Sequence, residues 1–150
     1  VPGDARLSLA REAAAGEARW DLLVLDAFNS DSIPVHLLTR EAFALYLERL
    51  APEGALVLNV SNHFLALERV VARVADAHGL VGWQRRQDTL TPEEKQAGCA
   101  RNHCLVLARS PAALSFLGPA RAAWEPLAQV PRARLWTDAH VDLPGVLELR

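Results

Sequence analysis

Cysteine is scarce in this sequence of 150 residues, since Cys99 and Cys104 are the only two. Two cysteines cannot build a disulfide framework, so we expect a reducing compartment, the cytoplasm. Long apolar runs are also lacking: no stretch approaches the ~18 to 20 apolar residues that cross a bilayer, and the N-terminus has no basic-then-apolar signal pattern. The sequence therefore predicts neither a membrane span nor a secretory leader.

An excess of positive charge is missing as well. The formal net charge is -2, from 16 Lys and Arg against 18 Asp and Glu. A nucleic-acid binder uses a basic surface to neutralise phosphates, so this balance disfavours nucleic acid as a partner. The hydrophobic content of 51% can bury one sizeable core, and 150 residues leave no room for a second domain of ordinary size.

Glycine is absent from the place where a nucleotide site needs it. No G-x-G turn joins a strand to a helix, and no acidic residue follows a second strand to hold a ribose. The chain also opens on Val1-Pro2-Gly3-Asp4 and passes at once into a helical pattern, as though a strand preceded it. We therefore expect residues 1–150 to be part of one domain whose N-terminal strands lie upstream.

The apolar pattern of the first half alternates between helices and strands. Helical spacing covers residues 5–15, with Asp4 as N-cap, and residues 40–50, with Thr39 as N-cap. Continuous apolar runs at residues 20–25 and 55–60, the second preceded by a Pro-Glu-Gly turn, are typical of strands buried in a parallel sheet. A third helix, capped by Ser61 or Asn62, is expected to end at Gly79. This alternation predicts an α/β fold.

The second half is less regular. Residues 80–87 and 103–109 read as strands joined by a charged connection without a helical pattern, which predicts an antiparallel hairpin at the edge of the sheet. Short helices are expected over residues 111–117 and 120–128.

Ligands of open α/β sheets bind beyond the carboxyl ends of the strands, which singles out Asp26 and the loop that it begins. Asp31 lies five positions further on, and two acids at such an edge suit a cationic amine. An alkylamine has a pKa near ~10 and must lose a proton before its nitrogen attacks; a carboxylate can order it and accept that proton. From spacing alone, Asp26 can equally be a turn former or helix cap, Asp31 a solvated loop acid, and Asp4 a simple N-cap.

Several segments, in order and spacing, resemble the second half of the polyamine aminopropyltransferases, or spermidine synthases. The segments are GDAR at residues 3–6, WDLLVLDAF at 20–28, SDSIP at 30–34, LLT at 37–39, LNVSN at 58–62 and LWTD at 135–138. The resemblance is strong over residues 3–79 and patchy thereafter. It is greatest to a bacterial spermidine-synthase-like branch that is often fused to membrane segments.

The resemblance implies the C-terminal half of a Rossmann-like, class I S-adenosylmethionine-dependent methyltransferase fold. It implies that Asp4 and the Ala5 backbone bind the adenine of the donor, and that Asp26 deprotonates the attacking amine. Asp31 would grip the amine, and the loop through Ser32, Ile33 and Pro34 would close over it.

The implied reaction moves an aminopropyl group from decarboxylated S-adenosylmethionine to a polyamine such as putrescine. The donor is a co-substrate, and no tightly bound cofactor or metal is implied. A methyltransferase that uses intact S-adenosylmethionine and a non-catalytic ligand-binding domain of the same fold remain as alternatives. A homodimer and a parent chain attached to the cytoplasmic face of a membrane are compatible with the resemblance.

The sequence also departs from the family pattern. The stretch between the two acids is longer than in the classical synthases, Ser32 rather than proline follows Asp31, and Ala139 stands where the related branch has a further acid. These departures leave the identity of the amine open. Because the glycine-rich turn and the ribose-binding acid are lacking, we expect these residues alone to be inactive.

Two other groups of residues carry weaker signals. Cys99, His103 and Cys104 lie close in sequence, but three ligands without a paired motif do not define a zinc site, and buried cysteine usually acts as a small hydrophobe. His36 lies in the expected gate, where it is either a substrate contact or a surface histidine.

Overall fold

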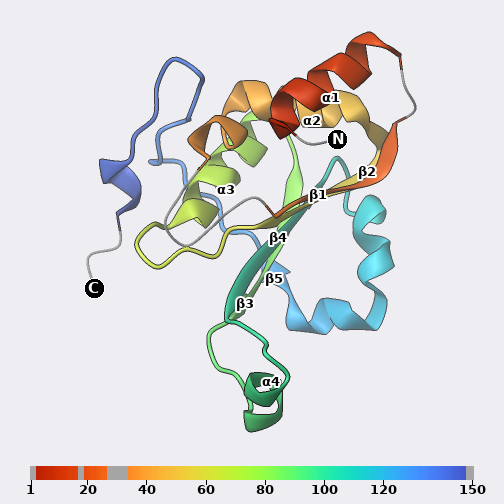
Figure 1. Cartoon of the computed structure of the whole chain (residues 1–150). Helices are drawn as coiled ribbons and strands as arrows, with labels where there is room; N and C mark the ends of the chain where they lie inside the picture. Colours follow the sequence, from red (N-terminus) through yellow and green to blue (C-terminus); the bar gives the residue numbers. More distant parts are fainter. Residues whose placement is uncertain (1–2, 17–18, 27–33, 148–150) are drawn as a thin grey trace.

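A computed structural model of the chain describes residues 3–16, 19–26 and 34–147. Its centre is a five-stranded sheet in the order β1-β2-β4-β3-β5 (Figure 1). The strands are β1 (Trp20–Leu25), β2 (Leu50–Asn59), β3 (Val81–Gln87), β4 (Asn102–Ala108) and the two-residue β5 (Glu125–Pro126).

The strand directions confirm the α/β class and the antiparallel hairpin. β1 and β2 are parallel, with Leu25 opposite Leu58, whereas β4 is antiparallel to both of its neighbours, β2 and β3. β1, β2 and β3 therefore share one direction, and β4, the last long strand in the chain, is inserted between β2 and β3. This mixed parallel and antiparallel sheet is consistent with a Rossmann-like methyltransferase fold.

Three helices cover one face of the sheet: α1 (Ala5–Ala14), α2 (Arg40–Arg49) and α3 (Leu67–Ala77) (Figure 1). The predicted N-caps of the first two are confirmed, because the side chains of Asp4 and Thr39 accept hydrogen bonds from Leu7 N and Ala42 N. Alternate strand residues Leu56, Leu58, Leu105 and Leu107 meet these helices in the main core. Successive side chains of a strand point to opposite faces of the sheet, so the residues next to these leucines in β2 and β4 face away from the three helices.

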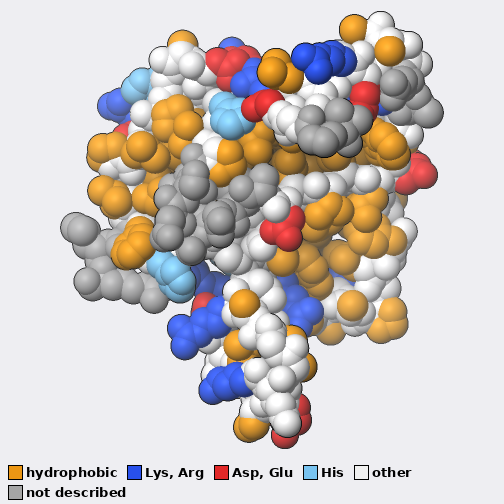
Figure 2. All heavy atoms as spheres, viewed as in Figure 1, with side chains coloured by type: hydrophobic (Ala, Val, Ile, Leu, Met, Phe, Trp, Pro, Cys, Tyr) orange, Lys and Arg blue, Asp and Glu red, His pale blue; other side chains and the backbone are white. Residues whose placement is uncertain are grey.

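On the opposite face, the 3₁₀ helix η2 (Ala112–Ala123) covers a smaller core around Val106. This cover does not extend to β1. There Trp20, Leu22 and Val24 are 48–56% exposed, and hydrophobic side chains gather along this part of the molecular surface in Figure 2. Among the described strands, β1 forms one edge of the sheet and β5 the other. The prediction that residues 20–25 form a strand buried on both faces is therefore wrong for this face.

The predicted turn at residues 52–54 is wrong, because these residues belong to β2, which begins directly after α2. Trp20 pairs with Leu50 and Leu22 with Ala55, so β2 accommodates three extra residues against β1. Such extra residues form a bulge, and a bulge tolerates Pro52, which has no N–H to donate to the ladder. A local Pro-Glu-Gly signal was thus outweighed by pairing with a distant strand.

The predicted cap of α3 is also wrong. Its N-cap is Ala66, without a side-chain hydrogen bond, and Ala66 N donates instead to Val146 O at 2.9 Å. Asn62 Oδ1 closes an earlier turn by accepting from Phe64 N and Leu65 N, both at 2.9 Å. The hydrogen bond to Val146, a residue near the C-terminus, thus takes the place of a side-chain cap at the start of this helix.

Two further segments differ from expectation. η2 replaces the first short helix and extends to Ala123, with a kink at Gly118, where φ is 47°. The second helix, expected to reach residue 128, is replaced from Glu125 by β5, which pairs with β3. In the charged connection, Thr91 and Glu94 form a capping box at the start of α4 (Pro92–Gln96). Within the described ranges no helix is both long and apolar enough to cross a membrane.

Candidate functional site

The carboxyl ends of β1 and β2 meet at one rim of the sheet because the two strands are parallel. Asp26 directly follows β1, and Asn59 is the last residue of β2. The two side chains are in contact: Asn59 Nδ2 donates to Asp26 Oδ1 at 2.9 Å. Asp26 is exposed, so its carboxylate is accessible at the place where the fold class binds its ligands.

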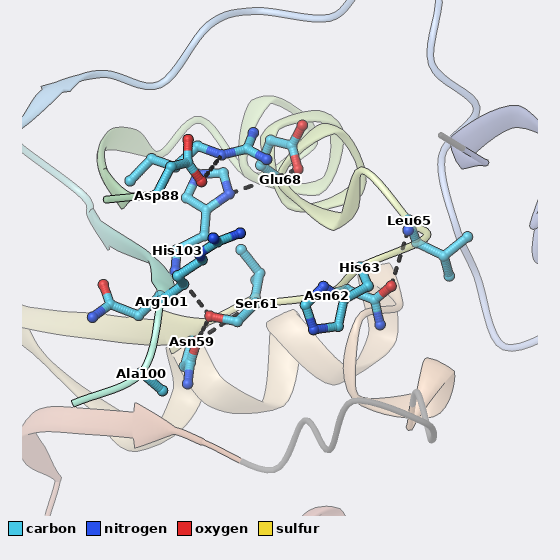
Figure 3. A pocket seen from close by; sticks show the side chains of 13 residues that line it. Asn59, Ser61, Asn62, His63, Leu65, Glu68, Asp88, Ala100, Arg101 and His103 are labelled. Atoms are coloured by element: carbon cyan, nitrogen blue, oxygen red, sulfur yellow. Dashed lines mark hydrogen bonds and ion pairs between the residues drawn. The ribbon is translucent and has the colours of Figure 1, made fainter. Parts of the chain in front are cut away.

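The amide of Asn59 is oriented by a chain of hydrogen bonds. Its Oδ1 accepts from Ser61 N at 3.1 Å and from Ser61 Oγ at 2.5 Å, and Ser61 Oγ accepts in turn from His103 N at 2.8 Å (Figure 3). With the oxygen occupied in this way, the NH₂ group faces Asp26. Sequence reasoning named Asn59 and Ser61 within a family segment but gave Asn59 no role and Ser61 only that of a possible helix cap, since Asp26 and His103 are distant from them in the sequence.

Asp4 acts as a helix cap in this structure. Its Oδ1 accepts from Leu7 N at 2.9 Å, and its Oδ2 lies 3.1 Å from His36 Nε2. The Leu7 N–H is the main cause that lowers the pKa of Asp4. Ala5 is the first residue of α1, so Asp4 and Ala5 stand at the helix end that faces the carboxyl rim. Their implied contact with adenine stays a prediction.

Asp31, Ser32 and Ile33 lie outside the described residues, so the expected convergence of Asp31 on Asp26 stays a prediction. Pro34 is described: it precedes the 3₁₀ helix η1 (Val35–Leu37), and its carbonyl accepts from Leu37 N at 2.8 Å. His36 is a partner of Asp4, as described above.

The C-terminal segment LWTD is held against the helices. Both terminal nitrogens of Arg6 donate to the carboxylate of Asp138, and Thr39 Oγ1 donates to Asp138 Oδ1 at 2.7 Å. These hydrogen bonds, the Arg6 bond first, lower the pKa of Asp138 to about 2. Trp136 is buried, and its carbonyl accepts from Arg40 N at 2.9 Å. In this structure the segment closes the fold across the start of α1 and α2.

A cavity of about 470 Å³ opens beside Asn59 at the same rim. Its walls come from the end of β2, the start of α3, the end of β3 and the start of β4 (Figure 3). Four charged residues line it: Glu68, Arg86, Asp88 and Arg101. Arg86 Nε lies 3.1 Å from Asp88 Oδ1, and Glu68 Oε2 lies 3.9 Å from Nδ1 of the buried His103.

Cys104 stands opposite Asn59 on β4. Partial burial raises the pKa of its thiol, and the negative charge of Asp26 adds to this shift. Cys99 is exposed, and both cysteines are free thiols. Within the part of the chain that the structure describes, no three His, Cys, Asp or Glu side chains are grouped so as to hold a metal ion.

Comparison with known proteins finds similarity to parts of longer chains, and no family model matches. A polyamine aminopropyltransferase from Vibrio vulnificus (strain CMCP6) is 42% identical over 57 residues, which are 38% of this chain and 19% of that protein. The crystal structure of MnmC2 from Aquifex aeolicus matches with a TM-score of 0.46 and 20% identity, over 72% of this chain and 29% of the other. The chain thus spans less than a third of the length of either protein.

Proposed function

We propose that this chain forms the amine-activating part of an aminopropyltransferase-like enzyme. The donor would be decarboxylated S-adenosylmethionine, and the acceptor an amine, for which putrescine is the first probe. The observation that carries the proposal is the contact between Asp26 and Asn59 at the carboxyl rim of the sheet. The partial relative from Vibrio vulnificus, which is named a polyamine aminopropyltransferase, supports the same reaction class.

The arrangement of Asp26 suits it to receive an ammonium group. Asn59 Nδ2 occupies Asp26 Oδ1, whereas Oδ2 makes no hydrogen bond to any of the described residues. An incoming ammonium can therefore donate to Oδ2 while Asn59 holds the carboxylate in place. A positioned base of this kind contributes about 10² to 10⁴ in rate to a proton-transfer step.

The proposed step needs one base and accurate positioning. The ammonium group passes a proton to Asp26, and its nitrogen lone pair then forms the new N–C bond to the aminopropyl carbon next to sulfur. The C–S bond breaks, and its electron pair leaves with the sulfur as a neutral thioether. Because the sulfonium is already a good leaving group, orientation supplies most of the remaining acceleration.

The test requires the complete protein, including the upstream donor-binding strands that the proposal expects. Purified protein is titrated with decarboxylated and with intact S-adenosylmethionine, and products are analysed by mass spectrometry after incubation with putrescine and other primary amines. An aminopropylated amine that forms only with the decarboxylated donor supports the proposal. A methylated product would assign a methyltransferase instead, and binding without turnover would assign a non-catalytic domain.

A further inference from the structure

We propose that the cavity beside Asn59 holds the far end of the acceptor amine and selects an acceptor whose far end is a carboxylate rather than a second ammonium. The proposal rests on the proposed function, because it places the reacting nitrogen at Asp26. It concerns the substrate class, which the sequence left open.

The position of the cavity connects it to the proposed base. Asn59 lines the cavity and also donates to Asp26, so one side chain lies between the two. Asp26 itself is not among the lining residues. A ligand that donates to Asp26 with one end can therefore extend past Asn59 into the hollow. The volume of about 470 Å³ lies within the usual range of small-molecule sites and exceeds the needs of a four-carbon amine.

The charges of the lining do not suit a polycation. Two arginines and two carboxylates face the cavity, so their formal charges cancel. Arg86 is paired with Asp88 at 3.1 Å, and Glu68 faces His103 at 3.9 Å. A second ammonium would have to compete for carboxylates that already face cationic or hydrogen-bonding groups. It would also enter a cavity whose wall includes the cation Arg101.

Arg101 provides the favourable partner for an anion. It is exposed at the cavity wall, ahead of β4, and makes no ion pair with any residue of the described ranges (Figure 3). A guanidinium binds a carboxylate through two parallel hydrogen bonds, which gives both strength and orientation. In an acceptor with an amine at one end and a carboxylate at the other, the ammonium would thus pair with Asp26 and the carboxylate with Arg101.

Three four-carbon amines separate the possibilities, because they differ only at the far end. 4-Aminobutanoate ends in a carboxylate, butylamine in a methyl group and putrescine in a second ammonium. Their kcat/KM values are measured with the complete protein and its donor, and their affinities are measured by calorimetry. We expect 4-aminobutanoate to exceed putrescine in both quantities by about tenfold or more, the effect of one charge-assisted hydrogen-bond pair.

The Arg101→Gln variant tests the assigned residue. It should lower affinity and kcat/KM for 4-aminobutanoate by about 10- to 100-fold while changing butylamine by less than about twofold. Arg132→Gln is the matched control, since it removes an exposed arginine that lines none of the described cavities. The control should leave the order of the three amines unchanged.

Two results would overturn the inference: tighter binding of putrescine than of 4-aminobutanoate, or unchanged 4-aminobutanoate binding in Arg101→Gln. Tighter putrescine binding that is lost in Glu68→Gln would assign the cavity to a second ammonium. Failure of the proposed function looks different, because no amine would then be aminopropylated with either donor. Calorimetry does not require turnover, so it still decides which far end the cavity accepts.

Discussion

The Asn59 side chain makes three hydrogen bonds at the rim, although sequence reasoning gave it no chemical role. Its amide joins Asp26 to Ser61, and Ser61 joins it to the backbone of β4 through His103 N. A buried or half-buried amide held at both ends has one orientation, which gives the neighbouring carboxylate a defined direction. The geometry of Asp26, which follows β1, thus depends on the side chains of Asn59 and Ser61 and on the backbone of β4.

Replacing the proposed base gives the first prediction. In the complete protein, Asp26→Asn should reduce turnover by about 10² to 10⁴, because the amide keeps the shape of the side chain but cannot accept the proton. Donor affinity should be largely retained, and both quantities are measured by single-turnover kinetics and donor titration. Asp21→Asn, the same exchange at the opposite end of β1, serves as control. Near-normal turnover of Asp26→Asn would remove this residue from the mechanism.

Gly82 gives a second prediction, on stability. A Cβ added there would lie 2.6 Å from Cδ2 of Leu107 and 3.1 Å from Cδ2 of Leu127. Leu107 is fully buried in the main core, so its side chain has little room to move. Gly82→Ala should therefore lower the free energy of unfolding by about 1–3 kcal/mol, measured by urea denaturation.

A double variant identifies the clash as the cause. Leu107→Val removes the atom that the new methyl group meets, so Gly82→Ala/Leu107→Val should lose less stability than the sum of the single variants. Strict additivity would show that the loss arises from the β3 backbone and not from this contact.

The junction of α2, β2 and β4 shows how neighbouring elements hold one another. Arg109, directly after β4, donates to Ala51 O at 2.7 Å and also to Leu47 O in the last turn of α2. The carbonyls at the end of a helix lack intrahelical donors and carry partial negative charge, so a guanidinium stabilises them. These hydrogen bonds from Arg109 stabilise the junction at which β2 follows α2 directly, without a loop.

Removing that guanidinium gives the third prediction. Arg109→Gln should lower the free energy of unfolding by about 1–2 kcal/mol and increase amide exchange in the last turn of α2. Chemical denaturation and hydrogen-exchange mass spectrometry measure the two effects. Arg132→Gln again removes an exposed arginine and should change neither. Equal losses in both variants would point to net charge and not to the cap.

At the scale of the whole molecule, an ion pair joins α1 to the C-terminal segment that contains Asp138. Arg6 and Asp138 lie 132 positions apart, and their ion pair, extended by Thr39, holds the C-terminal segment against α1 and α2. The pKa of Asp138 is lowered from 3.8 to about 2, so the charged form is favoured in the folded state. A lowered pKa means that the contact stabilises the fold above about pH 4 and that this stabilisation is lost as the pH falls towards about 2.

The fourth prediction follows from that direction. Asp138→Asn should lower Tm at pH 7, and the difference from the unmodified protein should shrink as the pH falls from about 4 to about 2. Differential scanning calorimetry across this range measures it. Asp21→Asn, which removes a carboxylate without an ion pair in the described structure, should have little effect at pH 7. A Tm difference that stays constant down to pH 2 would contradict the assigned role of the charge.

The order of elements could be read from the chain before its fold was known. The apolar run of β1, the helical stripes of α1 and α2 and their caps at Asp4 and Thr39 all depend on residues a few positions apart. The same local pattern placed Asp26 at a strand end. Periodicity and capping are short-range effects, and for this reason the α/β class and the first strand end were predictable.

Contacts between distant residues decided the rest. The bulge that keeps residues 52–54 in β2, the start of α3 at Leu67 and the pairing of β5 with β3 each depend on a partner far away in the sequence. The same holds for the Asn59 amide beside Asp26, the Arg6–Asp138 closure and the cavity wall that carries Arg101. Such partners are chosen by strand order and core burial, which act only once the chain has folded.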